Sequence, residues 1–203
     1  ISFDMVVDIS SNLYLHTIFF MFHFNITSEI GQLTKILIHS PDNGLGKVVP
    51  SKAQDWLFED IVHLDTIRRE EYDHYIKLLM YFLDPKKIKG RLKEIDAPES
   101  NRVFYQPSHN DFHRSEHVIE LHWLLADVLS DKLLCSQIIA SVCAIEGCTH
   151  STQELLQTYT PSELASCLLS GTGNDKSVLF APIPNFIFTR DIGIVIKDHI
   201  VLN

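Results

Sequence analysis

One carboxylate stands out near the end of the chain, in the segment PNFIFTRDIGIVIKDHIVLN (Pro184–Asn203). Asp191 follows an apolar and aromatic run, Phe186–Phe188, and precedes two short apolar runs, Ile192–Ile196 and Ile200–Leu202. This pattern predicts strand, corner, strand, tight turn and strand, with Asp191 at the corner. A carboxylate there either belongs to a functional site or serves a turn or an ion pair. Without further context, the turn or ion pair is favoured.

The cysteines do not form a recognisable reactive or metal-binding set. They lack C-x-x-C spacing, and no histidine stands at zinc-site spacing from any of them: Cys135, Cys143, Cys148 and Cys167. Most fall in segments that we expect to be amphipathic helices. We therefore interpret them as reduced, buried thiols of a cytosolic protein.

Three histidines could share one face of a helix. His109, His113 and His117 are spaced four residues apart, which is the spacing of metal ligands on a helix. Pro107 and Ser108 precede them, so the helix can begin after His109, and no carboxylate completes the ligand set. The pattern therefore favours a solvated or capping role, and the sequence predicts no metal site.

Composition excludes several classes of function. The 203 residues include 45% hydrophobic and 21% charged residues, which is ordinary for a globular protein. The net charge of -9 argues against a nucleic-acid partner, which requires a basic surface. The apolar run Leu13–Phe24 is too short to span a bilayer and lacks the features of a signal peptide. We expect a cytoplasmic protein with no membrane partner.

The elements that would position these residues begin with a strand. Thr34–His39 is rich in isoleucine and is bounded by a proline, as strands are. The loop Pro41–Pro50 contains Gly44 and Gly46, which predict flexibility, so it is either a lid or a plain surface connection. Thr66–Leu83 has apolar residues at three- and four-residue steps, which predicts a long helix ending before Pro85.

The following segment, Pro85–Asp175, shows no strand alternation and is expected to fold as several short helices. Each expected helix begins at a residue that can cap it: Ser115, Ser130, Ser151 and Thr160. Strands are expected to resume at Ser177–Phe180. The pattern indicates a helical bundle inserted into an α/β domain.

Three segments in this order resemble a known family. They are SEIGQLTKILIHSP (Ser28–Pro41), LFEDI (Leu57–Ile61) and PNFIFTRD (Pro184–Asp191), with the helical insertion between the second and the third. Together they resemble arginine deiminase and related guanidino-group-modifying enzymes of the amidinotransferase-like fold. The resemblance covers Asn25–Asn203, and the insertion favours the deiminase branch.

The resemblance implies an α/β fold, part of a five-bladed pseudosymmetric propeller of ββαβ units with an inserted helical bundle. Residues 1–24 would be an upstream or non-family segment, and 25–84 the first blade. Residues 85–176 would be the inserted bundle, and 177–203 the truncated start of the second blade. On this interpretation the chain is an N-terminal fragment.

The resemblance also implies a reaction. Arginine deiminases hydrolyse L-arginine to L-citrulline and ammonia, with no metal or organic cofactor. In the family a cysteine thiolate attacks the guanidinium carbon, a histidine moves protons, and two carboxylates bind the guanidinium. The implied partner is therefore a small guanidino substrate, and homo-oligomerisation of a full-length protein remains open.

By match to the family motif, Asp191 would bind the guanidinium group. Asn185 would lie near the amino-acid end of the substrate, and Phe188 would line the pocket beside its aliphatic part. The residues alone leave a turn role for Asn185 and a core role for Phe188 equally open. Asn43, in a loop resembling one that covers the substrate, would be a lid residue. Its polarity departs from the family and leaves the guanidino substrate open.

The family's nucleophilic cysteine, its histidine and its second carboxylate would lie beyond Asn203. The chain's own cysteines all fall in the insertion, so none can replace the nucleophile, and we expect this chain alone to be inactive. Two alternatives stay open. One is an amidinotransferase of the same fold, and the other is a truncated, non-catalytic protein that binds guanidines or mediates interactions.

Overall fold

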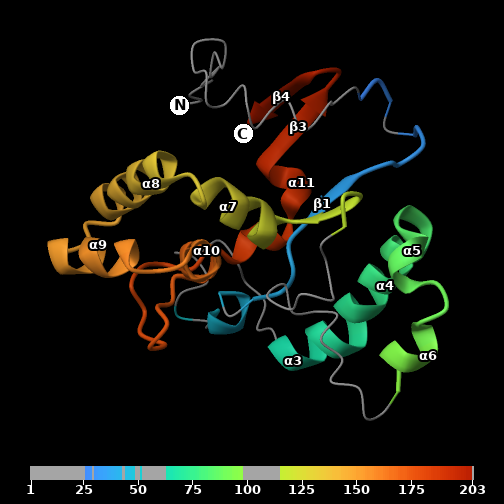
Figure 1. Cartoon of the computed structure of the whole chain (residues 1–203), viewed down its shortest axis with the longest axis horizontal. Coiled ribbons are helices and arrows are strands. Elements are labelled where there is room, and N and C mark those ends of the chain that lie inside the picture. The colour runs from blue at the N-terminus through green and yellow to red at the C-terminus, as the bar shows by residue number, and fades with distance from the viewer. Residues whose placement is uncertain are drawn as a thin grey trace. The chain divides into compact units, whose positions relative to one another are not determined.

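The computed structural model in Figure 1 describes residues 26–28, 30–42, 44–48, 51, 63–97 and 115–202. The chain divides into two compact units, Thr34–Ile187 and a smaller unit that combines Ile1–Leu33 with Phe188–Asn203. The LFEDI segment and the histidines His109 and His113 lie outside the described residues.

The larger unit contains a parallel pair of strands. Strand β1 (Ile36–Ile38) lies beside β2 (Val118–Glu120), with Ile36 opposite Val118 and Ile38 opposite Glu120. Parallel strands need a long crossover connection, and the chain between them includes helices α3 to α6. The strand predicted at Thr34–His39 is confirmed in its central residues.

The prediction that a helix starts directly after Ser115 was wrong. The Ser115 hydroxyl accepts the backbone N–H groups of His117 and Val118, both at 3.1 Å, and donates to the Asp84 carboxylate at 2.7 Å. This turn leads into strand β2, and helix α7 begins only at Leu121. Residues Val118–Glu120 were expected in a helix, but they form a strand because they pair with β1.

A long helical segment crosses between the strands, as predicted for Thr66–Leu83. It consists of α3 (Leu64–Thr66), the π-helical turn η4 (Ile67–Tyr72) and α4 (Asp73–Leu83). It ends at Asp84, whose φ of -137° leaves the helical region ahead of Pro85. Two short helices follow, α5 (Pro85–Ile88) and α6 (Leu92–Ile95).

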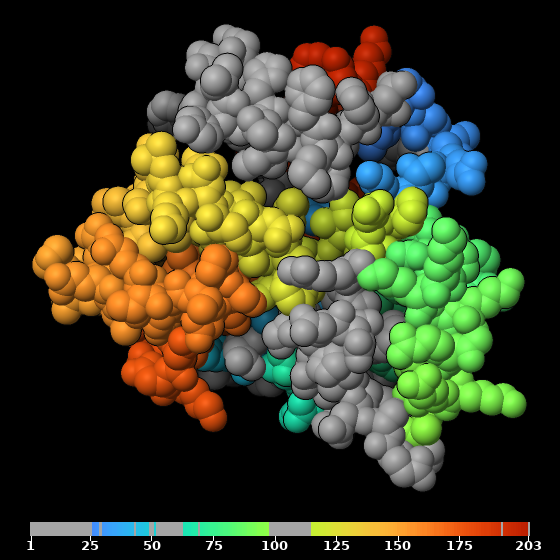
Figure 2. All heavy atoms as spheres, in the orientation of Figure 1, coloured from blue at the N-terminus to red at the C-terminus, as the bar shows by residue number. Residues whose placement is uncertain are grey.

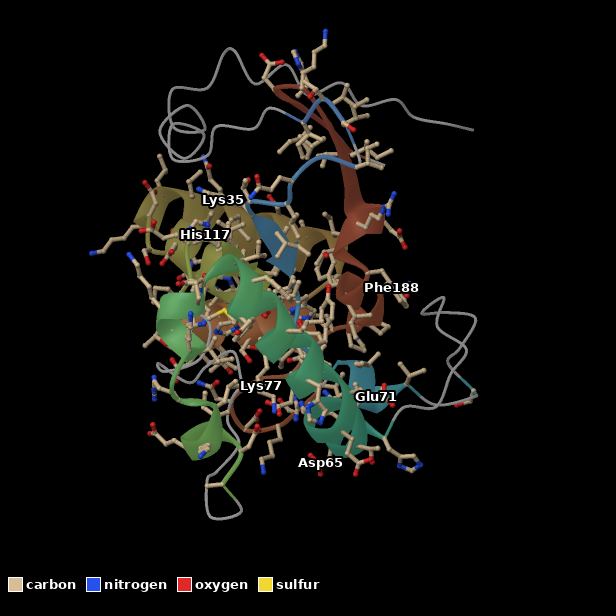
Figure 3. All side chains as sticks on the ribbon, turned by 90° about the vertical axis from the view of Figure 1, so that its right-hand side faces the viewer. Lys35, Asp65, Glu71, Lys77, His117 and Phe188 are labelled. Atoms are coloured by element: carbon tan, nitrogen blue, oxygen red, sulfur yellow. The ribbon has the colours of Figure 1, made fainter. Side chains whose placement is uncertain are left out.

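A buried ion pair anchors α4 to the segment after α6. Lys77 Nζ lies 2.9 Å from the Asp73 carboxylate one turn earlier and 2.7 Å from that of Asp96 (Figure 3). Asp73 is fully buried, and such a charge is stable only when it is paired. The apolar core of this half is formed by residues from the strands and these helices: Ile38, Ile76, Met80, Ile88, Ile95 and Val118.

Four helices form the second half of the larger unit, the yellow to orange region of Figures 1 and 2. They are α7 (Leu121–Leu129), α8 (Lys132–Ile145), α9 (His150–Gln157) and α10 (Pro161–Ser170). Helix α10 packs against α7, and α8 contacts both α7 and α9. These helices pack around one core, which includes Ala126, Leu129, Ile139, Leu156, Leu164 and Leu168. The insertion of a bundle over residues 85–176 into an α/β domain stays a prediction.

None of the described helices alone has both the length and the apolar character to cross a membrane. Helices α7 and α8 meet that test only as a pair, and they are bent by 110° at their junction.

Only one of the expected capping residues begins its helix as predicted. Thr160 and Glu163 form a reciprocal capping box ahead of α10, with Pro161 in the first turn. Asp131, one residue after the expected Ser130, caps α8 by accepting two backbone N–H groups at 2.9 and 3.0 Å. Thr149 caps α9 in place of Ser151. A carboxylate accepts such bonds better than a hydroxyl, which accounts for the shift at α8.

Glycines end two of the bundle helices. Gly147 and Gly171 have φ of +63° and +67°, the left-handed conformation that glycine adopts without steric cost. After Gly171, the expected strand at Ser177–Phe180 is reduced to a single bridge between Thr172 and Val178.

The described strands of the smaller unit form a hairpin. Strands β3 (Gly193–Ile196) and β4 (His199–Leu202) pair antiparallel, and Ile26 bridges to Lys197 at the turn. Both predicted strands and the tight turn between them are confirmed. The described strands form two two-stranded sheets, so the five-bladed propeller and its domain boundaries stay predictions.

Candidate functional site

The segment that carries Asp191 is helical on both sides of Phe188. Pro184–Ile187 forms the 3-10 helix η5, and Thr189–Ile192 forms the single-turn helix α11. The strand expected at Phe186–Phe188 was therefore wrong. Pro184 lacks a backbone N–H and fixes its own φ, which suits the first position of a helical turn better than a central strand.

Asp191 lies on α11, directly before β3. Its backbone N–H donates to the Phe188 carbonyl at 2.9 Å, which closes the turn, and its side chain is exposed. Phe188, directly before α11 (Figure 3), has 49% of its surface exposed. Both residues therefore face solvent within their unit, as ligand-binding groups in an open site do.

Of the other two predicted site residues, the structure describes only Asn185. Asn185 is half-buried in η5 and lies in the larger unit, whereas Asn43 lies outside the described residues. The structure therefore brings Phe188 and Asp191 together on one turn. The roles proposed for Asn185 and Asn43 stay predictions.

The described part of the loop after β1, residues 41–42 and 44–48, is packed against its surroundings. Its Asp42 carboxylate accepts the N–H groups of Gly44 and Leu45 at 2.8 and 3.2 Å, and the 3-10 turn η2 (Leu45–Lys47) follows. Leu45 and Val48 are buried. Gly44 and Gly46 each permit a close approach of the backbone to neighbouring atoms, and the expected flexibility of the loop stays a prediction.

The close approaches are specific. A Cβ atom on Gly44 would lie 2.9 Å from Asp42 Oδ1 and 3.2 Å from Pro182 Cβ. A Cβ on Gly46 would lie 3.0 Å from Leu64. The backbone of the loop therefore touches both the helical crossover and the segment after α10.

A buried polar cluster lies at the start of this loop. Glu120, at the end of β2, is only 1% exposed. Its two oxygens accept the Ser40 N–H, each at 3.1 Å, and one also accepts the Ser40 hydroxyl at 2.8 Å. His39 Nδ1 lies 3.2 Å from the other carboxylate oxygen, Oε1. Glu120 thus joins β2 to the residues that lead out of β1.

His39 lies between two carboxylates. Its Nδ1 faces Glu120, and its Nε2 lies 3.5 Å from Asp42 Oδ2. Burial disfavours the charged imidazole, but the hydrogen bonds and charges of Asp42 and Glu120 outweigh it and raise the pKa of His39 from 6.5 to about 9. His39 is therefore a cation at neutral pH.

Two further titratable side chains surround Glu120. Burial lowers the pKa of His122, whose Nε2 lies 3.0 Å from the Ser162 hydroxyl, so His122 is neutral at neutral pH. Burial, reinforced by the Glu120 charge, raises the pKa of Tyr72 well above its usual value. The cluster therefore contains one imidazolium between two carboxylates, with neutral neighbours.

Sequence reasoning missed both His39 and Glu120 as members of a site. The available signal was a charged residue inside an apolar run, VIEL, and polar residues directly after the strand ILI. These residues meet only because the two strands pair, which brings Ser40 and Glu120, 80 residues apart in the chain, into contact.

The thiols and histidines show no metal site within the described ranges. The four cysteines are free, with Cys143 and Cys167 buried. Burial raises the pKa of the Cys167 thiol to about 11 and also raises those of Cys135 and Cys143. His117 lies at the surface before β2, 3.1 Å from the Thr34 carbonyl.

The chain is similar to curated arginine deiminases. It is 26% identical over 195 residues to that of Borreliella burgdorferi (strain ZS7). It is 23% identical over 201 residues to that of Bacillus cytotoxicus and 24% identical over 197 residues to that of Limosilactobacillus fermentum. No family model matches the chain.

Each of these alignments covers 88% of this chain and 41% of the relative, so the chain spans about two fifths of the length of these proteins. The resemblance to arginine deiminases is confirmed at this level. The activity of a whole protein of this kind is a separate matter and is proposed below.

Proposed function

We propose that this chain carries part of the guanidinium-binding site of an arginine deiminase-type hydrolase, which converts L-arginine to L-citrulline and ammonia. The observation that carries the proposal is the similarity to arginine deiminases over 88% of the chain. The proposal places the guanidinium at Asp191, because the segment PNFIFTRD resembles the family's guanidinium-binding motif.

Asp191 has the chemistry that this role requires. A guanidinium is planar and presents paired N–H donors, and an ionised carboxylate accepts two of them side by side. Its position on a one-turn helix leaves the carboxylate exposed, so a ligand can reach it. Holding the guanidinium in one orientation would fix the carbon for attack.

The roles of the other proposed site residues rest on the resemblance. Phe188, exposed on the same turn as Asp191, would cover the aliphatic part of the substrate, and Asn185 would bind near its amino-acid end. Asn43 would belong to the covering loop. Arginine is the favoured substrate through the resemblance, and agmatine and methylated arginines are the alternatives to compare.

The nucleophile is proposed to come from residues outside these 203. A reactive cysteine needs a stabilised thiolate, whereas burial raises the thiol pKa of Cys135, Cys143 and Cys167. A thiolate attack on the guanidinium carbon would release ammonia and leave a thiouronium, which water would hydrolyse to citrulline. We therefore expect the 203-residue chain alone not to produce citrulline.

The test is a citrulline and ammonia assay on the protein expressed from the longest reading frame that contains this chain. L-arginine should be converted, and Asp191→Asn should lower kcat/KM by about 10- to 100-fold, because a charge-assisted pair is lost. Asp198→Asn is the matched control, since Asp198 is also exposed and lies in the hairpin turn. Equal activity in both variants would remove Asp191 from the site.

The same assay separates the alternatives. Transfer of the amidino group to an added amine, with no citrulline, would support an amidinotransferase. Binding of arginine without turnover, abolished by Asp191→Asn, would support a non-catalytic guanidine-binding protein. No binding and no turnover would contradict the proposal.

A further inference from the structure

We propose that Glu120 and His39 are positioning residues for the loop Pro41–Val48. Glu120 fixes Ser40 and His39 at the end of β1, and His39 holds Asp42, whose other carboxylate oxygen caps the loop. The consequence for substrate rests on the proposed function, in which this loop covers the guanidino ligand. The positioning itself rests on the contacts below.

The first contact set fixes where the loop begins. Glu120 takes three donors from Ser40 and His39, and its backbone is held in register by the β1–β2 pairing. Glu120 is fully buried, so bulk water cannot replace these donors. A buried carboxylate that lost these donors would carry a large desolvation penalty, which makes the arrangement rigid.

The second set of contacts connects His39 to the first turn of the loop through Asp42. Asp42 uses Oδ2 toward His39 and Oδ1 toward the N–H groups of Gly44 and Leu45. One carboxylate therefore ties the imidazolium to the first turn of the loop. Loss of the charge on His39 would weaken the hold on Asp42 and, through it, the capped turn.

Other contacts pin the loop at both ends. Arg68 Nε donates to the Pro41 carbonyl at 2.7 Å, and the Lys47 amine donates to the Thr172 hydroxyl. These contacts do not involve His39. We therefore expect a local change in Asp42, Gly44 and Leu45 when His39 is neutralised, with the loop ends remaining attached.

The charged and titratable groups that act on His39 come from several elements. Glu120 on β2 and Asp42 in the loop favour its cationic form. His122 on α7 is neutral, and Tyr72 on η4 stays protonated, so neither opposes the charge at neutral pH. Because the pKa of His39 is raised from 6.5 to about 9, the stability it adds is fully present below pH 6.5 and is lost as pH rises through about 9.

The experiment is a carbon-detected NMR titration of the ¹³C,¹⁵N-labelled 203-residue chain through the neutral and alkaline range. The imidazole carbons of His39 should titrate near pH 9. The carbonyl resonances of Asp42 and Gly44 should follow the same midpoint. Glu120→Gln, which keeps shape and removes charge, should lower the His39 midpoint by about one to three pH units, and the loop resonances should move with it.

Glu116→Gln is the matched control, because Glu116 is an exposed carboxylate just before β2. It should leave both midpoints unchanged. Asp42→Asn is the second variant if Glu120→Gln fails to fold. It keeps the capping oxygen but should lower the His39 midpoint and remove the pH dependence of the Gly44 resonance.

A titration midpoint of His39 near pH 6.5 in the wild-type chain would overturn the positioning role. Loop resonances that do not change with the titration of His39 would also overturn it. In the protein expressed from the longest reading frame that contains this chain, Glu120→Gln should raise KM for the guanidino substrate more than it lowers kcat. If that protein shows no guanidine chemistry, the proposed function fails while the NMR result still decides the positioning role.

Discussion

At the scale of single residues, the structure depends on a few buried charged side chains that have charged or hydrogen-bonding partners. Glu120 receives donors from Ser40 and His39, and Asp73 is held by Lys77. Removing one partner from such a set leaves a buried charge uncompensated, which is more costly than the loss of the bond itself. These residues therefore fix local geometry beyond what apolar packing would require.

The thiols provide a residue-scale prediction. At pH 8, iodoacetamide should modify Cys148 several-fold faster than Cys167, because Cys167 is 1% exposed and its pKa is raised to about 11. The Cys167 thiol stays neutral at pH values below its raised pKa, so its reactivity should increase only in strongly alkaline solution. Peptide mass spectrometry after timed quenching measures both rates.

The unfolded chain is the control, in which all four cysteines should react at similar rates. Faster modification of Cys167 than of Cys148 in the folded protein would contradict the burial of Cys167 and would reopen a nucleophilic role for it.

At the scale of elements, helix α4 is apolar on more than its core face. Ile76 and Met80 are buried, whereas Leu78 and Phe82 on the opposite side are exposed. A helix that is apolar all round usually packs on both sides. Sequence periodicity predicted this helix correctly, but it could not assign the buried face.

Paired alanine substitutions on α4 test this assignment. Met80→Ala should lower the free energy of unfolding by about 2–5 kcal/mol, because it opens a cavity in the core. Phe82→Ala, at a site 72% exposed, should change it by no more than about 0.5 kcal/mol. Urea denaturation followed by circular dichroism measures both, and equal losses would mean that Phe82 is covered in solution.

At the scale of the whole molecule, the described residues of the two units bury different amounts of apolar surface. The larger unit has two apolar cores, around Leu164 in the bundle and Ile76 beside the strands. The described strands of the smaller unit form a two-stranded hairpin, with Ile194 and Val201 more than half exposed. Two-stranded hairpins are only marginally stable by themselves.

Hydrogen exchange should therefore separate the units. Backbone amides in α8 and α10 should be the most protected, because these helices pack around the bundle core. Amides of β3 and β4 should exchange orders of magnitude faster, at rates close to local fraying. Mass spectrometry of peptides from each segment measures this, and comparable protection in Gly193–Leu202 would mean that the hairpin is stabilised by further contacts.

Local signals in the sequence were sufficient for several features. The helix across Thr66–Leu83, the capping box at Thr160 and Glu163, and the hairpin strands near the end depend on periodicity and on residues a few positions apart. The resemblance to arginine deiminases also rests on short continuous segments. Such signals survive in the sequence because the interactions behind them are local.

Tertiary structure alone decided the rest. The segment Val118–Glu120 is a strand because β1 lies beside it, and Glu120 is buried because that pairing places its carboxylate against Ser40 and His39. The same long-range contacts pack the loop after β1. Asp191 was identifiable from its motif, but its helical turn was not, because the 3-10 and α turns around Phe188 compete closely with an extended strand of the same apolar residues.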